Sequence, residues 1–187
     1  MNDPLSSMKM FDHDYPETNV SERLTIAIRH IEFARNYSMS LLEGLDDDDW
    51  YWSPEAFPTH IAWQVGHLAM SQYGLTLFQQ RGRSREVDSQ LMSSKFRKLF
   101  MRGTSPTRDR ADYPEPAEML EVLNRVHSQM RLEIVTYDGD PLDEPLGPPH
   151  AGYATRYGAL LFAGDHEMIH SGQIGMLRRL MGKEPLR

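Results

Sequence analysis

Two histidines, His166 and His170, stand four positions apart in the segment 164–182, which reads GDHEMIHSGQIGMLRRLMG. On a helix this spacing places both rings on one face, one turn apart, where they can bind the same metal ion. The same residues spell H-E-x-x-H, the motif in which two zinc ligands of a peptidase flank a glutamate that acts as general base. The chemistry indicated is that of a divalent metal held by imidazole.

A third ligand must come from another helix, because a catalytic site of this kind uses three protein ligands and an open position. His67 is the best candidate, since it lies in the middle of a predicted helix on a side that carries polar as well as aromatic residues: His60, Trp63, His67, Ser71, Gly74 and Phe78. His60 is the reserve candidate, and His150 is an outer neighbour. His13 and His30 have no such context. The alternative is that these histidines are hydrogen-bonded polar residues at the end of a helical bundle.

A zincin peptidase is not favoured. Zincins take their third ligand from the chain beyond the motif and use the edge of a sheet to align the peptide, but here Glu184 falls after the predicted helix end and no strands are evident. A serine nucleophile elbow and a phosphate-binding glycine loop are also absent from the sequence.

The amino-acid composition restricts the class of protein further. The 187 residues fit one domain of ordinary soluble composition, and the formal net charge of −7 argues against nucleic-acid binding. No apolar run approaches the roughly 20 residues of a membrane span, so a cytoplasmic location is expected. The sequence contains no cysteine, so any thiol chemistry requires a thiol supplied from outside.

Helical periodicity predicts four long helices. The first begins near Asn19, with Glu22 completing a capping box, and ends near Gly44. The second spans about 59–80 with Thr59 as N-cap. The third follows Pro116 and carries the apolar stripe Met119, Leu123, Val126, Met130, Ile134 and Tyr137, with His127 at its boundary. The fourth begins near Thr155 and ends before Gly182.

Between these helices we expect loops. Residues 46–54 form an acidic turn without the ligand spacing of a calcium loop, and 139–149 are a Pro/Gly connection. Residues 81–115 form a long crossover between the second and third helices, with a short helix at 92–101. The whole is an all-α four-helix bundle, a single domain over 18–187 preceded by a flexible arm, 1–17.

The crossover is basic, with nine Lys or Arg residues against five Asp or Glu. Two interpretations remain open: the cations bind an anionic cofactor or substrate, or they are the solvated charges of an ordinary connection.

Three segments carry a resemblance to a known family: WQVGHLA at 63–69, FMRGTSP at 100–106, and HEMIHSGQI at 166–174 continuing to LRRLMGK at 177–183. With these segments the chain resembles the DinB/YfiT superfamily over nearly its whole length after the N-terminal arm. The resemblance implies an up-down-down-up bundle, often a homodimer, with a metal held by His67, His166 and His170. It also implies kinship with thiol-dependent S-transferases and isomerases that use bacillithiol or mycothiol, although many members have no assigned activity.

The resulting hypothesis is a metal (zinc, nickel or iron) that activates a bound thiol or water toward a small-molecule substrate. Glu167 and Asp165 are candidate catalytic residues, as a base or as hydrogen-bond partners of a ligand histidine; the alternative is that both are partly exposed carboxylates. Gln173 and Tyr157 are candidates for cofactor binding, with Trp63 and Tyr153 also near the entrance. The competing function is a non-catalytic metal-binding or stress-response bundle, in which the ion only ties two helices together.

Overall fold

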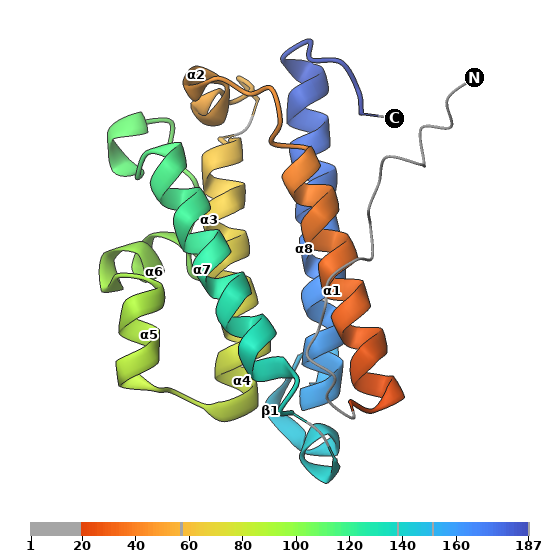
Figure 1. Ribbon diagram of the computed structural model, residues 1–187. Helices are drawn as coiled ribbons and strands as arrows, with labels where there is room; N and C mark the ends of the chain where they lie inside the picture. The colour runs from red at the N-terminus through yellow and green to blue at the C-terminus, as the bar shows by residue number, and fades with distance from the viewer. Residues whose placement is uncertain (1–19, 57, 138, 151, 187) are drawn as a thin grey trace, which may run out of the picture.

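The computed structural model describes residues 20–56, 58–137, 139–150 and 152–186. Its principal elements are four helices: α1 (Glu22–Ser40), α3 (Ile61–Gln72), α7 (Pro116–Ile134) and α8 (Arg156–Leu180). Figure 1 shows that α1 and α8 run in one direction and that α3 and α7 run in the other. The predicted all-α bundle with up-down-down-up order is confirmed. The predicted N-terminal arm lies outside the described residues.

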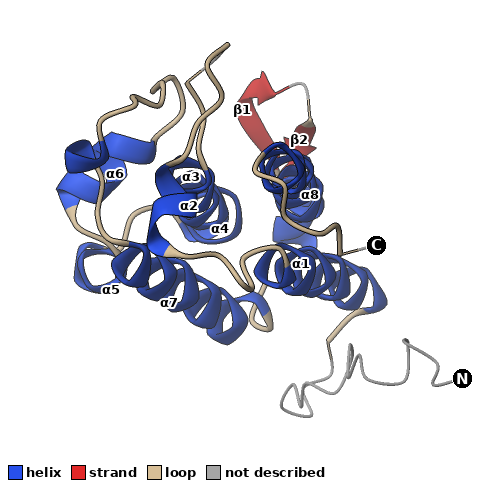
Figure 2. Ribbon diagram, turned by 90° about the horizontal axis from the view of Figure 1, so that it is seen from above, coloured by secondary structure: helices blue, strands red, loops and turns tan. Residues whose placement is uncertain are grey.

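The smaller elements connect these helices or extend them: α2 (Asp47–Tyr51), η1 (Tyr73–Phe78), α4 (Gln79–Arg81), α5 (Arg85–Leu91), α6 (Ser94–Phe100), η2 (Arg110–Asp112), η3 (Asp140–Asp143), β1 (Pro145–His150) and β2 (Tyr153–Thr155). Figure 2 shows α5 and α6 beside α3 and α7, on the side away from α1. The long crossover is therefore present, but it contains two short α-helices and the 3₁₀ helix η2 instead of the one helix expected at 92–101. The chain breaks helical geometry at Met92, which is extended.

Two predicted loops are partly ordered into regular structure. β1 and β2 form an antiparallel hairpin against α8, so the expectation that no strands occur was wrong. Residues of the acidic turn form α2, because Asp46 and Asp49 complete a reciprocal capping box at its start.

Two predicted helix starts were wrong by one or two residues. Ser21 caps α1, where its hydroxyl accepts from the amide of Leu24 at 3.5 Å. His60 caps α3, because its Nδ1 accepts from the amide of Trp63 at 3.1 Å, whereas Thr59 contacts Gln64. An imidazole nitrogen thus acts as the N-cap acceptor, a role that a hydroxyl or carboxylate oxygen usually has.

The end of α8 matches the prediction. Gly182 has a φ of 76°, and the amide of Lys183 donates to the carbonyl of Arg178 at 3.0 Å. This is the glycine-terminated helix end that the sequence indicated.

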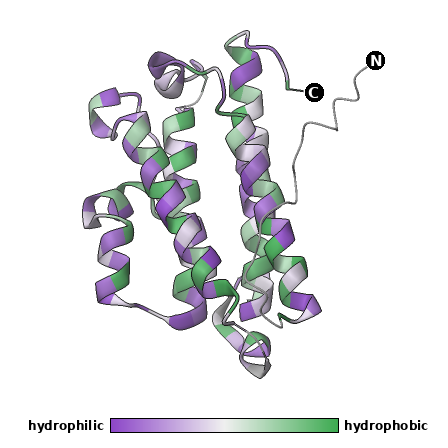
Figure 3. Ribbon diagram, viewed as in Figure 1, coloured by the Kyte–Doolittle hydropathy of each residue, from purple (hydrophilic) through white to green (hydrophobic). Residues whose placement is uncertain are grey.

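The core lies between the four principal helices. The predicted apolar stripe of α7 is confirmed, with Met119, Leu123, Val126, Met130 and Ile134 all fully buried; Tyr137 lies just beyond the end of the helix. Figure 3 shows hydrophobic residues concentrated along α3, which contacts both α7 and α8. No helix in the described ranges is long and apolar enough to cross a membrane.

One buried cation joins all four principal helices. Arg35 of α1 is 3% exposed, and its guanidinium donates to the carboxylate of Glu167 on α8 at 2.7 and 3.2 Å. It also donates to the side chain of Gln72 on α3 at 2.8 Å and approaches the carbonyl of Leu123 on α7 at 3.4 Å. The amide of Gln72 continues this polar network to His127 at 3.0 Å, so this histidine is a member of a core network.

A close approach between α3 and α6 requires glycine. A Cβ built on Gly66 would lie 2.3 Å from the ring of Phe100, which is fully buried. Gly74, further along the same helical run, has nothing within 4 Å of its Cβ position.

We therefore expect Gly66→Ala to destabilise the protein relative to Gly74→Ala by about 1–3 kcal/mol, the usual cost of overpacking a core. Both changes add one methyl group within the same helical run, so the difference in the free energy of unfolding reports mainly the contact with Phe100. Urea unfolding of the two variants measures it. Equal free energies of unfolding would show that α6 moves freely away from α3.

Candidate metal centre

Three histidines from two helices converge in the bundle. His67 lies on α3, and His166 and His170 lie one turn apart on α8. The candidate ligand atoms of the three rings all lie within 4.8 Å of one another. The i, i+4 spacing on α8 and the contact of α8 with α3 are sufficient to produce this arrangement.

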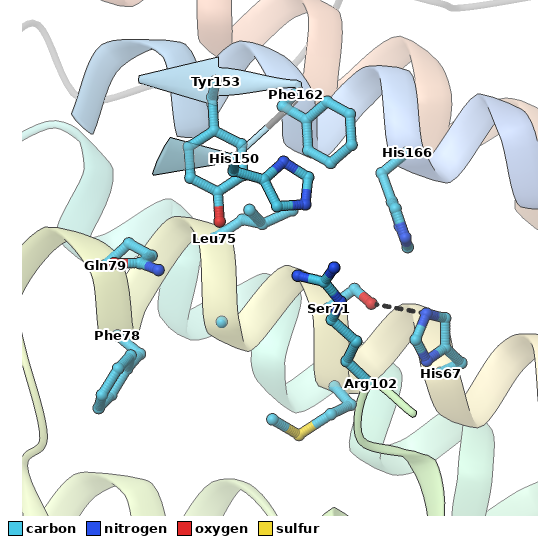
Figure 4. Close-up of a pocket in the computed structure, with 12 residues that line it drawn as sticks. His67, Ser71, Leu75, Phe78, Gln79, Arg102, His150, Tyr153, Phe162 and His166 are labelled. Carbon is cyan, nitrogen blue, oxygen red and sulfur yellow. Dashed lines mark hydrogen bonds between the residues drawn. The ribbon is translucent and has the colours of Figure 1, made fainter. Parts of the chain in front are cut away.

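The cluster lies at one side of a cavity of about 320 Å³, shown in Figure 4. Its lining consists of His67, Met70, Ser71, Gly74, Leu75, Phe78, Gln79, Arg102, His150, Tyr153, Phe162 and His166. Gly74, Leu75 and Phe78 of this lining belong to η1, a π-helical stretch in which the amide of Gln79 donates to the carbonyl of Gly74. Such wide turns are frequent at functional sites, because they displace side chains from the regular helical register.

His67 is held in one orientation and one tautomer. Its Nδ1 lies 2.8 Å from the carbonyl oxygen of Phe100, which can only accept, so Nδ1 carries the proton and Nε2 keeps its lone pair. The indole of Trp63 stacks on this ring at 4.8 Å with an interplanar angle of 6°. In this structure Nε2 accepts from the hydroxyl of Ser71 at 3.2 Å.

His170 is oriented in the same way. Its Nδ1 contacts the side-chain oxygen of Gln64, whose amide nitrogen donates to Thr59 at 2.8 Å. The amide is thereby fixed with its oxygen toward the ring, which leaves Nε2 of His170 as the free donor atom. Hydrogen bonding of the second ring nitrogen is the usual means by which proteins orient a metal-binding histidine.

His166 is positioned by ring contacts. Its imidazole lies 4.5 Å from the ring of His170 and 5.7 Å from that of Phe162, measured between centroids. In the described part of the chain no hydrogen bond orients it. Because Phe162 precedes His166 by one turn of α8, the same helical face supplies the ligand and its packing partner.

The environment keeps all three rings neutral. Burial lowers the pKa of His166 to about 4, and the nearby ring of His67 contributes. Burial together with the two neighbouring rings lowers the pKa of His170 to about 3. Burial also lowers the pKa of His67. Near pH 7 each ring therefore presents an unprotonated nitrogen, which a metal ion requires.

The donor set fits a divalent metal. Three neutral imidazoles suit Zn²⁺, Ni²⁺ or Fe²⁺, and two of the three have the orienting hydrogen bond that such ligands need. No fourth His, Asp or Glu of the described residues joins the group. The cluster can hold a metal ion, and two of its rings, His67 and His166, face the cavity.

The two candidate carboxylates point to other partners. Glu167 was expected to be a base, a hydrogen-bond partner of a ligand or a partly exposed group, but it is 3% exposed and bound by Arg35 and Ser38. Asp165 is exposed and lies 2.8 Å from His30. Glu167, the glutamate of the H-E-x-x-H motif, is therefore bonded within the bundle core. Neither Glu167 nor Asp165 lines the cavity, where a base would be needed.

The two candidates for cofactor binding, Tyr157 and Gln173, lie outside the cavity lining. The hydroxyl of Tyr157 donates to the carbonyl of Arg23, and its ring lies under that guanidinium; Gln173 is half-buried and outside the cavity lining. Tyr153 and His150 do line the cavity.

The reserve ligand His60 is not near the cluster's cavity. It caps α3, its Nε2 faces the carbonyl of Thr107 at 3.1 Å, and burial lowers its pKa to about 4. Four residues of the predicted polar side of this helix line the cavity: His67, Ser71, Gly74 and Phe78.

Sequence reasoning missed three contributors: Gln64, the backbone carbonyl of Phe100 and Phe162. Gln64 had a readable signal, because a polar residue one turn before His67 interrupts an otherwise apolar helical segment. Phe162 had one as well, at four residues before His166. The carbonyl of Phe100 has none, since every residue carries the same group.

These features define a helical bundle with three convergent imidazoles, two of which line an open cavity. The sequence profile of the DinB superfamily matches residues 30–174. The chain belongs to the DinB superfamily. No curated protein matches the sequence closely enough to extend this assignment.

We expect the purified protein, reconstituted with Zn²⁺ or Ni²⁺, to hold about one ion per chain, because three neutral imidazoles are already gathered. His67→Ala and His170→Ala should lose this stoichiometric metal, as measured by elemental analysis after gel filtration. His30→Ala is the matched control, since this ring lies against Asp165, outside the cluster. Retention of one ion by both ligand variants would contradict the assignment.

Gln64→Leu should weaken metal binding by about 10–100-fold, the range found when an orienting partner of a ligand is removed. Gln80→Leu is the control: it replaces another buried glutamine of the same helical run, which bonds the carbonyls of Leu75 and Arg156 instead. Competition with a chelator measures both affinities. The same affinity in both variants would show that Gln64 does not orient His170.

Proposed function

We propose that this protein is a metal-dependent enzyme that transfers a small thiol to an electrophilic substrate, resembling the S-transferases of its superfamily. The observation that carries the proposal is the open side of the histidine cluster, where two of the three rings line a cavity. A site that serves only to tie helices together is usually closed by a fourth protein ligand, and no further His, Asp or Glu of the described residues joins this cluster.

A divalent ion held by His67, His166 and His170 would supply a Lewis acid that lowers the pKa of a thiol or water molecule bound to it. The protein contributes position and shelter. Gln64 and the carbonyl of Phe100 keep two rings aimed at one point. With an ion at Nε2 of His67, the hydroxyl of Ser71, which now bonds this nitrogen, would be available to a ligand in the cavity.

The thiol comes from outside, because the chain contains no cysteine. In the proposed step the thiol sulfur bonds to the electrophilic carbon of the substrate. With an aryl chloride the carbon–chlorine bond breaks, chloride leaves with its electron pair, and the proton of the thiol passes to water. The products are a thioether, chloride and a proton, so no oxidant or reductant is consumed.

A structural ion is the second candidate. His170 is 8% exposed, and the cluster connects α3 to α8, so a bound ion would also stabilise the contact between these helices. The two functions differ in whether a small thiol gains access to the cluster.

We expect metal-loaded protein to accelerate the reaction of a small thiol with 1-chloro-2,4-dinitrobenzene, followed by its absorbance change. His166→Ala should reduce the rate to the uncatalysed background. Asp165→Asn should keep the rate of the unmodified protein, because this carboxylate is exposed and faces His30. If the loaded protein gives only the background rate with several thiols and electrophiles, the structural role is the better description.

A further inference from the structure

Arg102 is a cation in the cavity with no partner of its own. Figure 4 shows its guanidinium directed into the space between Ser71 and His67 on one side and His150 on the other. Within the part of the chain that the structure describes, it has neither an ion pair nor a hydrogen bond. Arg102 is exposed and lines the cavity, so its guanidinium is available to an anion that enters from solvent.

Other arginines of the basic crossover are already engaged. Arg81 binds Asp88 and Glu133. Arg110 binds Asp48 and Glu115. Arg108 donates to Ser53 and to the carbonyls of 54 and 55. Three of the nine cations of the crossover are therefore held by partners within the chain, and Arg102 is the one of the nine that lines the cavity.

The rest of the lining suits an anion with an apolar body. No Asp or Glu lines the cavity, so nothing there opposes a negative charge. Leu75, Phe78 and Phe162 provide apolar wall, and the cluster face of His67 and His166 lies beside them. A volume of about 320 Å³ is within the range of small-molecule sites.

We propose that the cavity binds a small molecule bearing a carboxylate, with Arg102 as the anion-binding residue. The apolar part of the molecule lies against Leu75, Phe78 and Phe162. The planar guanidinium matches a carboxylate with two parallel hydrogen bonds, which gives direction as well as attraction. The orientation of the reacting end toward the histidine cluster rests on the proposed function; the carboxylate site itself does not.

Binding to metal-free protein tests the site independently of catalysis. The probes are 3-phenylpropionate and its neutral counterpart 3-phenylpropionamide, titrated by calorimetry into the unmodified protein, Arg102→Gln and Arg83→Gln. Arg83 is the matched control, an exposed arginine of the same crossover outside the cavity lining. Arg102 has no contact to lose, so its replacement should leave the fold intact.

We expect the carboxylate to bind about tenfold more tightly than the amide, because a charge-assisted pair at a partly exposed site contributes modestly. Arg102→Gln should remove this preference, and Arg83→Gln should keep it. A preference that is absent from the unmodified protein, or that survives Arg102→Gln, overturns the proposal.

The carboxylate can belong to the thiol or to the electrophile. With metal-loaded protein, 3-mercaptopropionate is compared with 2-mercaptoethanol, and 4-chloro-3,5-dinitrobenzoate with its amide. A rise in KM confined to one carboxylate reactant in Arg102→Gln assigns the carboxylate to that reactant, whereas an unchanged KM for both overturns the placement of Arg102 in the reacting complex. If the metal-loaded unmodified protein shows no turnover but still prefers the carboxylate probe, the proposed function is refuted and the anion site is retained.

Discussion

The buried pair between Arg35 and Glu167 is the interaction on which the site depends. Glu167 follows His166 directly, and neighbouring residues on a helix point about 100° apart. When the guanidinium in the core binds Glu167, the rotation of α8 is fixed, and His166 and His170 are turned toward α3. Loss of either partner would leave an unpaired charge in the core, at a cost of about 3–5 kcal/mol. The glutamate of H-E-x-x-H therefore positions the histidines through the helix it anchors.

Two conditions must hold together at the cluster: the rings must be neutral, and they must aim at one point. Burial provides the first, since it disfavours imidazolium. The common aim comes from hydrogen bonds at Nδ1: Gln64 bonds His170, and the carbonyl of Phe100 bonds His67. The crossover thus belongs to the site: α6 ends at this carbonyl, and Arg102 follows two residues later. Gly66 permits the close approach of α6 that places them both.

Much of the bundle could be predicted, because buried helix faces leave a regular apolar period, as on α7, and because the histidine spacing of α8 is local. The hairpin 145–155 could not be predicted, since its Pro/Gly-rich sequence lacks alternation. The burial of Glu167 was missed because its partner Arg35 is 132 residues away in sequence. His60 was considered a ligand because spacing alone does not reveal that its ring caps a helix. Local patterns identified the three histidines that converge, whereas long-range partners determined where the neighbouring acidic and polar residues lie.

X-ray absorption of the Zn- or Ni-loaded protein tests the central claim most directly, because it counts the imidazoles bound to the ion in solution. We expect scattering from three imidazole rings together with at least one further ligand that is not a histidine, and we expect a sulfur ligand to appear when a small thiol is added. Two rings or fewer would show that the three histidines do not bind the ion together. A metal whose coordination positions are all filled by the protein, and whose spectrum does not change with thiol, would contradict an open, reactive centre.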